Sequence, residues 1–174
     1  MCIRDSQIGL QDVNKDSTSS ITNNSTRTEV YNFVVANPGI QFRGICTGLG
    51  IAIGTAEFHL GVLKRAGLIS FVRDGKYKRF FVSKKYSMKD MKIISLLRHE
   101  RTRKIIKKIA SDEIVPHKKL ASYLSITSQG LTWQINQLRK KGIIKENIDG
   151  VKVSYSLTKE YFHLLPELIC VIEQ

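Results

Sequence analysis

Apolar residues recur at helical spacing ahead of Gly67, and beyond it they alternate with polar residues. Leu60 and Leu63 lie on one face of a helix that Gly67 ends, since glycine adopts the left-handed conformation without a Cβ clash. The two apolar runs that follow flank Asp74-Gly75, a dipeptide typical of type I′ hairpin turns with positive φ at both central residues. The pattern therefore predicts a helix, a glycine stop and a β-hairpin.

The same pattern returns later in the chain. Gly142 stands 75 positions after Gly67, and Asp149-Gly150 stands 75 positions after Asp74-Gly75. The apolar pairs that keep this spacing are Leu49 and Leu124, Ile51 and Ile126, Leu60 and Ile135, Leu63 and Leu138, Phe80 and Tyr155, and Val82 and Leu157. Because the shared positions are apolar or turn-forming, the repeat is one of packing. The exposed positions differ, which indicates different tasks for the two copies.

The remaining periodicity predicts further helices around these two segments. They cover 28–36, 42–49 and 53–66 in the first copy, and a segment around Ile105, Ile106 and Ile109, then 118–124 and 128–141, in the second, with Thr127 or Ser128 as the last N-cap. A linking helix is expected within 84–98, where Ser95 offers a second N-cap. A tail helix follows Thr158, and Pro166 bends or interrupts it.

Alternation also assigns faces to the two hairpins. Val151, Val153, Tyr155 and Leu157 alternate with polar residues, so we expect this set to face a core. On the first hairpin, Tyr77 and Phe81 lie on the face opposite Phe80 and Val82, and we expect them to pack on the linking helix.

Three helices followed by a hairpin make up a winged helix-turn-helix, so the sequence predicts a mainly α fold with small β-hairpin wings (α+β). The predicted organisation is two tandem winged helix-turn-helix domains joined by a linker helix. Its parts are a disordered polar tail (1–26), domain 1 (27–83), a basic linker helix (84–98), domain 2 (99–158) and a C-terminal helix (159–174).

Positive charge is concentrated within the repeats. The chain has 174 residues, a net charge of +13 and a sequence pI near 9.8. Residues 27–83 have 8 basic and 3 acidic side chains, a net +5, and residues 84–158 have 17 and 6, a net +11. This excess indicates a polyanionic partner. The alternative is an ordinary solvated surface.

Other chemistry has little support. Cys2, Cys46 and Cys170 are odd in number, far apart and outside any CxxC motif, which predicts no metal site and suits a reducing cytoplasm. No apolar run approaches the ~20 residues of a membrane span, and the N-terminus has no apolar region typical of a signal peptide. Scattered histidines, with no phosphate loop and no clustered carboxylates, predict neither a cofactor nor an enzyme.

At these residues the sequence resembles winged-helix transcriptional regulators. Residues 55–69, TAEFHLGVLKRAGLI, resemble the recognition-helix signature of the ArsR-like class within the ArsR/MarR-like superfamily. The preceding 37–55, NPGIQFRGICTGLGIAIGT, is similar to archaeal proteins with two winged helices in tandem. The resemblance covers 27–158 and implies DNA binding. The cysteine pair of metal-sensing members is missing, since Cys46 is the single cysteine of its helix.

The resemblance and the residue types together predict the DNA contacts. In a helix-turn-helix the N-terminal part of the third helix meets base edges, and other side chains hold phosphates. In the first copy the expected contacts are Thr55, Glu57 and Phe58, a poor set for reading bases, with the wing residues Arg73, Lys76, Lys78 and Arg79 as phosphate contacts. In the second copy they are Ser128, Gln129, Thr132, Trp133, Asn136 and Arg139, with Lys145 and Lys152 from the wing.

Two functions follow from this interpretation. The first is a sequence-specific regulator that binds double-stranded DNA, in which domain 2 reads bases. The alternative is a structural or assembly protein, similar to tandem winged helices of chromosome segregation or general transcription, that binds mainly other proteins. The apolar tail helix either packs back on its own repeat or forms a homodimer. The transcription machinery is a further expected partner.

Overall fold

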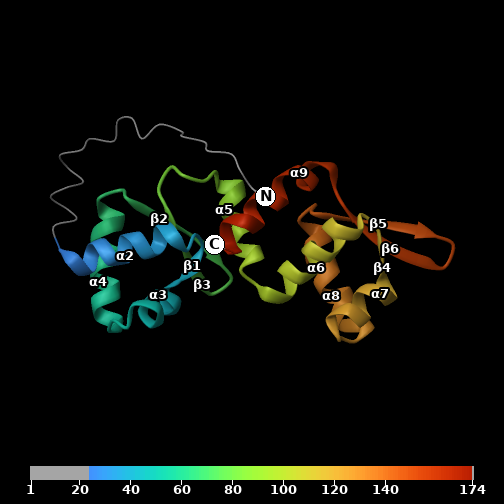
Figure 1. Cartoon of the computed structure of the whole chain (residues 1–174), viewed down its shortest axis with the longest axis horizontal. Helices are drawn as coiled ribbons and strands as arrows, with labels where there is room; N and C mark the ends of the chain where they lie inside the picture. Colours follow the sequence, from blue (N-terminus) through green and yellow to red (C-terminus); the bar gives the residue numbers. More distant parts are fainter. Residues whose placement is uncertain (1–23, 174) are drawn as a thin grey trace.

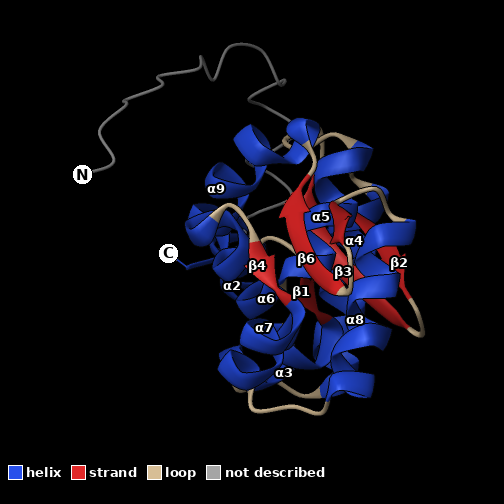
Figure 2. Cartoon of the chain, turned by 90° about the vertical axis from the view of Figure 1, so that its right-hand side faces the viewer, coloured by secondary structure: helices blue, strands red, loops and turns tan. Residues whose placement is uncertain are grey.

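A computed structural model describes residues 24–173, which form eight helices and six strands. The chain is elongated, with its first half at one end and its second half at the other (Figure 1). Helices α5 (Met88–Leu97) and α9 (Lys159–Glu173) lie between them. In Figure 2 the strands occupy the middle of the projection, with helices on either side. No single helix in 24–173 is long and apolar enough to cross a membrane. By length and composition alone, the pair α3 (Phe42–Leu49) and α4 (Ile53–Arg65), bent by 116°, would be.

The first half, Ser25–Val82, folds as three helices and a three-stranded sheet. Its elements are α2 (Ser25–Ala36), β1 (Ile40–Gln41), α3 (Phe42–Leu49), α4 (Ile53–Arg65), β2 (Ile69–Asp74) and β3 (Tyr77–Val82). Asn24 caps α2 by accepting a hydrogen bond from the backbone N–H of Arg27 at 3.1 Å. The prediction of a disordered tail to residue 26 is therefore wrong at its end, since Ser25 is already helical, and residues 1–23 lie outside the described part.

The second half, Glu100–Leu157, has the same order of elements. They are α6 (Glu100–Asp112), β4 (Val115–Pro116), α7 (His117–Leu124), α8 (Ser128–Lys140), β5 (Ile144–Asp149) and β6 (Lys152–Leu157). Of the two expected N-caps of α8, Thr127 is the one observed, accepting from the N–H of Gly130 at 3.2 Å. Two further helices complete the chain, α5 (Met88–Leu97) and α9 (Lys159–Glu173).

The two sheets share one topology. Their strand orders are β1-β3-β2 and β4-β6-β5, and their registers keep the spacing of 75, as in Ile69 opposite Val82 and Ile144 opposite Leu157. We call the hairpin β2–β3 the first wing and β5–β6 the second wing.

The turn of the first wing differs from the prediction. Asp74 pairs with Tyr77 inside the strands, so the central turn residues are Gly75 and Lys76. Only Gly75 has a positive φ, of 58°. A positive φ at the first central residue alone is the pattern of a type II′ turn, not the predicted type I′. Gly150 takes the same φ in the second wing.

Neighbouring residues of β3 serve two separate cores. Phe80 belongs to a small cluster in the first half that includes Val30, Ile45 and Leu63. Phe81 is fully buried on the opposite face, in a larger cluster that runs through α5 into the second half. α5 packs against β2, α6 and α9, and Gly39 lies so close that an added Cβ would be 3.0 Å from Ile94 Cγ2. The expectation that Phe81 packs on the linking helix is confirmed, whereas Tyr77 is 43% exposed.

The linking helix α5 and the tail helix α9 differ in detail from the helices that the sequence predicts. Ser95 starts no new helix, because its hydroxyl lies inside α5 and donates to Met91 O at 2.7 Å; the cap of α5 is Ser87, in a capping box with Asp90. α9 continues through Pro166 without a break. Its face formed by Tyr161, Leu165, Leu168 and Ile169 is buried within the same chain.

The second wing departs from the predicted alternation at its tip. Tyr155 and Leu157 are buried as expected, but Val151 is 98% exposed because it lies in the turn, beyond the end of the core. Ile148 across the hairpin is 70% exposed.

Candidate nucleic-acid interface

Helix α8 has one apolar and one polar face. Leu131, Ile135 and Leu138 recur at helical spacing and are buried in the core of the second half. The opposite side of the first two turns exposes Gln129, Thr132 and Trp133, the last with 61% of its surface free. Three of the predicted base contacts therefore share one solvent-facing surface.

The start of α8 is held by a histidine that the sequence analysis did not select. His117 Nδ1 lies 2.7 Å from the Tyr155 hydroxyl, and its Nε2 lies 2.8 Å from Ser128 Oγ. Tyr155 is buried on the second wing, and burial raises the pKa of its hydroxyl, with Glu146 adding to the effect. His117 thus connects the wing to the first residue of α8, and Ser128, predicted to contact DNA, has an intramolecular partner.

The other predicted contacts at this helix are less accessible to DNA or already have partners within the protein. Arg139 Nη1 forms an ion pair with Glu146 of β5, and Asn136 is only partly exposed. The Thr132 hydroxyl donates to Ser128 O at 2.9 Å within the helix, which leaves its methyl group for outside contacts. The hollow between α8 and the second wing is about 730 Å³ and is lined by Thr132, His117 and Lys152, among others.

Much of the positive charge of the second half is internally balanced. Ion pairs join Lys104 to Glu100, Lys107 and Arg103 to Glu173, and Lys108 and Lys119 to Asp112. Hydrogen bonds from Lys119 and Lys108 hold the pKa of the Asp112 carboxyl well below its usual range. Lys145 and Lys152 of the second wing are exposed and have no carboxylate partner in the described part of the chain.

The first half presents a different helix surface. At the start of α4, Thr55 and Glu57 are exposed, and the neighbouring large side chains are apolar: Ile53 is 63% and Phe58 is 58% exposed. The wing residues Arg73, Lys76 and Lys78 are also exposed, as expected. His59 is buried, and burial together with Arg27 lowers its pKa. Its Nδ1 has no hydrogen-bond partner among residues 24–173.

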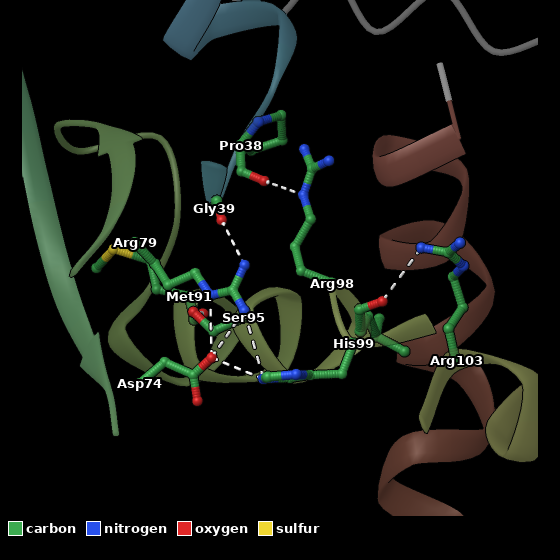
Figure 3. Close-up of polar contacts among 10 residues, drawn as sticks. Pro38, Gly39, Asp74, Arg79, Met91, Ser95, Arg98, His99 and Arg103 are labelled. Carbon is green, nitrogen blue, oxygen red and sulfur yellow. Dashed lines mark hydrogen bonds and ion pairs between the residues drawn. The ribbon is translucent and has the colours of Figure 1, made fainter. Parts of the chain in front are cut away.

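Arg79 is not a phosphate contact, contrary to the prediction. Only 3% of it is exposed, since it points inward from β3 (Figure 3). Its Nε lies 2.9 Å from Asp74 Oδ2, and its Nη1 lies 3.3 Å from Gly39 O. The composition of the wing suggested four equivalent cations, but alternation along β3 places this one under the sheet.

Both halves therefore join a helix–turn–helix to a β-hairpin wing that lies beside the third helix. The fold is a winged helix. No family model matches the chain. The chain is 25% identical over 136 residues to an uncharacterized HTH-type transcriptional regulator of Methanocaldococcus jannaschii, a match over 78% of this chain. The expected resemblance to transcriptional regulators of the helix-turn-helix type is confirmed by this relative.

The matched region is about a third of that relative, since it covers 34% of its length. Among solved structures, HlyU from Vibrio cholerae is similar, with 24% identity, a TM-score of 0.42, and coverage of 50% of this chain and 98% of HlyU. FabT of Streptococcus pneumoniae, solved in complex with DNA, is 19% identical with a TM-score of 0.33, covering 67% of this chain and 76% of FabT. Both scores are low, so the winged-helix assignment rests on the order and register of the elements.

The histidines, cysteines and carboxylates of the described residues do not form a cluster. Within residues 24–173 no group of three or more such side chains is placed to hold an ion. Cys46 is partly buried in α3 and Cys170 is exposed on α9. The candidate site is therefore a surface of helix and wing residues, not a pocket for a metal.

Proposed function

We propose that this protein is a transcriptional regulator that binds double-stranded DNA in a sequence-specific way through two tandem winged-helix domains. Domain 1 begins with α2 at Ser25 and extends to residue 83, and domain 2 covers 99–158, with 84–98 as the linker. The observation that carries the proposal is the amphipathic α8, whose exposed face combines Gln129, Thr132 and Trp133 while its other face is packed. The similarity to an HTH-type transcriptional regulator supports it.

The residue types on α8 suit base recognition. An α-helix fits the major groove, where glutamine or asparagine bonds both N6 and N7 of adenine, and methyl or ring carbons contact the thymine methyl group. Gln129 and Asn136 would supply the first kind of contact, and Thr132 and Trp133 the second. His117 would keep the start of α8 at a set distance from the second wing, because its ring bridges Ser128 and Tyr155.

Phosphate contacts would come from the wings. Arg73, Lys76 and Lys78 of the first wing, and Lys145 and Lys152 of the second, are exposed. None of these five cations is in an ion pair within residues 24–173. On binding DNA they would displace the counterions of the phosphates. Because added salt opposes this release, the affinity for DNA should fall steeply as the salt concentration rises.

The experiment is a comparison of one selected duplex with a random one, by fluorescence anisotropy, for matched variants. Gln129→Ala should weaken binding to the selected duplex by about 1 to 3 kcal/mol and leave the random duplex unchanged. Lys152→Gln should weaken both duplexes alike and lower the salt slope by about 1. Equal losses on both duplexes for every variant would overturn the assignment of base reading to α8.

One observation favours the alternative of a protein-binding role for the first half. Ile53 and Phe58 are exposed on α4 where a base-reading helix would have polar side chains. A structural or assembly protein that binds mainly other proteins, including the transcription machinery, would use this surface. Weaker binding to protein partners in Ile53→Ser, with duplex binding unchanged by Gln129→Ala and Lys152→Gln, would favour the alternative. Unchanged protein binding in Ile53→Ser, with duplex binding weakened by the other two variants, would exclude it.

A homodimer through the C-terminal helix stays a prediction, as does a cytoplasmic location. The apolar face of α9 is occupied by its own chain, and Phe162, 44% exposed, is the large apolar side chain left on the outside. Sedimentation equilibrium of the whole chain and of Phe162→Ser tests the dimer. A monomer at all concentrations would exclude it.

A further inference from the structure

A groove lies between α4 and the first wing and is distinct from the surface of α8. It is about 500 Å³, which is within the range of ligand sites in proteins. Its walls come from the end of β1, from α3 and α4, and from β2, β3 and the turn of the first wing. Four aromatic side chains line it: Phe42, Phe71, Tyr77 and Phe80.

The charge of this groove is strongly one-sided. Arg43, Lys64, Lys76 and Lys78 line it, and Glu57 is its single acidic residue. None of these four cations has a carboxylate partner among residues 24–173, in contrast to the paired cations of α6. The groove therefore holds uncompensated positive charge beside apolar rings, which favours an anionic ligand.

The lysines are already placed against ring faces. Lys64 Nζ lies 4.9 Å and Lys78 Nζ lies 5.2 Å from the centroid of Phe71. Lys76 Nζ lies 5.4 Å from the centroid of Tyr77, whose side chain is exposed at the turn. Aromatic faces with adjacent cations are the arrangement by which proteins stack a base and neutralise its phosphate.

A glycine keeps the groove open on the α4 side. Gly61 lines it, and an added Cβ would meet nothing closer than Arg65 Nη1 at 3.6 Å, an ordinary contact. The position 75 residues later is Asn136, so the second half has a side chain where the first half has space. A substitution at Gly61 can therefore fill the groove without disturbing the packing beneath it.

We infer that this groove binds a nucleotide whose base is unpaired, with the ring stacked on Tyr77 and the phosphate between Lys64 and Lys78. In a duplex both faces of each base are already stacked on neighbours, so an aromatic platform in a groove requires a base that is free. The ligand is either a nucleotide within a single strand of DNA or a free nucleotide. This inference goes beyond duplex reading and does not depend on α8.

The test uses the whole chain and two probes, fluorescein-labelled oligothymidylate and unlabelled dTMP as its competitor. Tyr77→Ala should weaken oligothymidylate binding by at least about fivefold, the lower limit for loss of one base–aromatic stack, while Tyr77→Phe retains it. Gly61→Gln should abolish binding by filling the groove. Gly54→Gln is the matched control, because Gly54 lies on the same helix, outside the groove and in open space.

Two further arms decide the source and exclude plain electrostatics. If dTMP displaces the oligothymidylate at a similar concentration, the ligand is a free nucleotide. If dTMP competes only weakly, the ligand is a nucleotide within a single strand. Either result supports the inference. Lys152→Gln removes one exposed wing cation outside the groove and should change binding less than Lys78→Gln does. Equal losses for these two variants, or full binding by Gly61→Gln, would overturn the inference, whatever Gln129→Ala does to duplex binding.

Discussion

His99 Nε2 lies 2.8 Å from Asp74 Oδ2, and this contact joins the first wing to the residue that directly precedes α6, the first helix of the second half (Figure 3). The same carboxylate oxygen accepts from Arg79, and Arg98 Nε donates to Pro38 O at 2.9 Å. Burial, with Arg79 and Arg103 nearby, lowers the pKa of Arg98. The two halves are therefore joined by a polar connection as well as by α5, so their relative position is held by side chains from both.

Arg79 is expected to stabilise the fold and to have no direct part in DNA binding. Arg79→Met removes one of the two partners of Asp74 and the donor to Gly39 O. We expect a loss of about 2 to 3 kcal/mol in the free energy of unfolding, less than for a fully buried pair because Asp74 is 25% exposed. Urea unfolding measures it. Arg73→Met, an exposed cation on the same wing, is the control and should leave stability within about 0.5 kcal/mol. Equal stability of the two variants would contradict this.

Phe81 is expected to couple the unfolding of the two halves. Its ring is fully buried in the cluster shared by the first wing, α5 and the second half. Phe81→Ala should cost about 3 to 5 kcal/mol and separate one calorimetric transition into two. Leu120→Ala, buried within the second half, should lower stability without separating the transitions. A single transition in both variants would show that coupling does not pass through Phe81.

Gly39 is expected to tolerate no side chain. Its φ is +76°, and an added Cβ would be 3.0 Å from Ile94 Cγ2 and 3.2 Å from Phe81 Cζ. Gly39→Ala should destabilise by about 1 to 3 kcal/mol, from backbone strain and crowding together. Gly67→Ala isolates the strain, because Gly67 has φ +70° and open space around it. Thermal unfolding of both variants checks this, and an equal loss in the two would remove crowding as a cause.

His59 makes stability depend on pH. Burial and then Arg27 lower its pKa below the ordinary 6.5, so the unfolded chain binds the proton more readily than the folded one. The contribution of neutral His59 to stability is therefore complete above pH 6.5. It is lost as the pH falls below 6.5 through the lower pKa of the folded state. Melting temperatures of the wild type and His59→Met across this range measure the effect. His163→Gln, an exposed histidine, should keep the wild-type slope; a wild-type slope in His59→Met would exclude His59 as the source.

Local pattern was sufficient for most of the secondary structure and for the spacing of 75 positions between the two wings. Leu60 and Leu63 show helical spacing, and the residues around Phe80 show alternation. Both patterns reflect which side of an element is buried, and both can be recognised from residues close together in the sequence. The surface of α8 was predictable for the same reason, since a helix that buries Leu131 and Ile135 must expose Gln129 and Thr132. The turn type was not, because pairing across the hairpin decided which two residues are central.

Contacts between distant segments were beyond the sequence. Arg79 resembles its neighbours Lys76 and Lys78 in charge, and the sequence did not reveal its partners Asp74, Gly39 and His99, which the fold brings around it. His117 likewise contacts Ser128 and Tyr155, which are 11 and 38 positions away in the sequence and are brought together only by the fold.

The sequence by itself determined two helix–hairpin units spaced 75 positions apart and the polar face of α8, because periodicity alone sets which side of an element is buried. Tertiary structure decided which cations are free, what fills the face of α9, and that a groove opens beside Gly61. Those properties depend on side chains brought together from several elements, and no spacing along the chain records such distances.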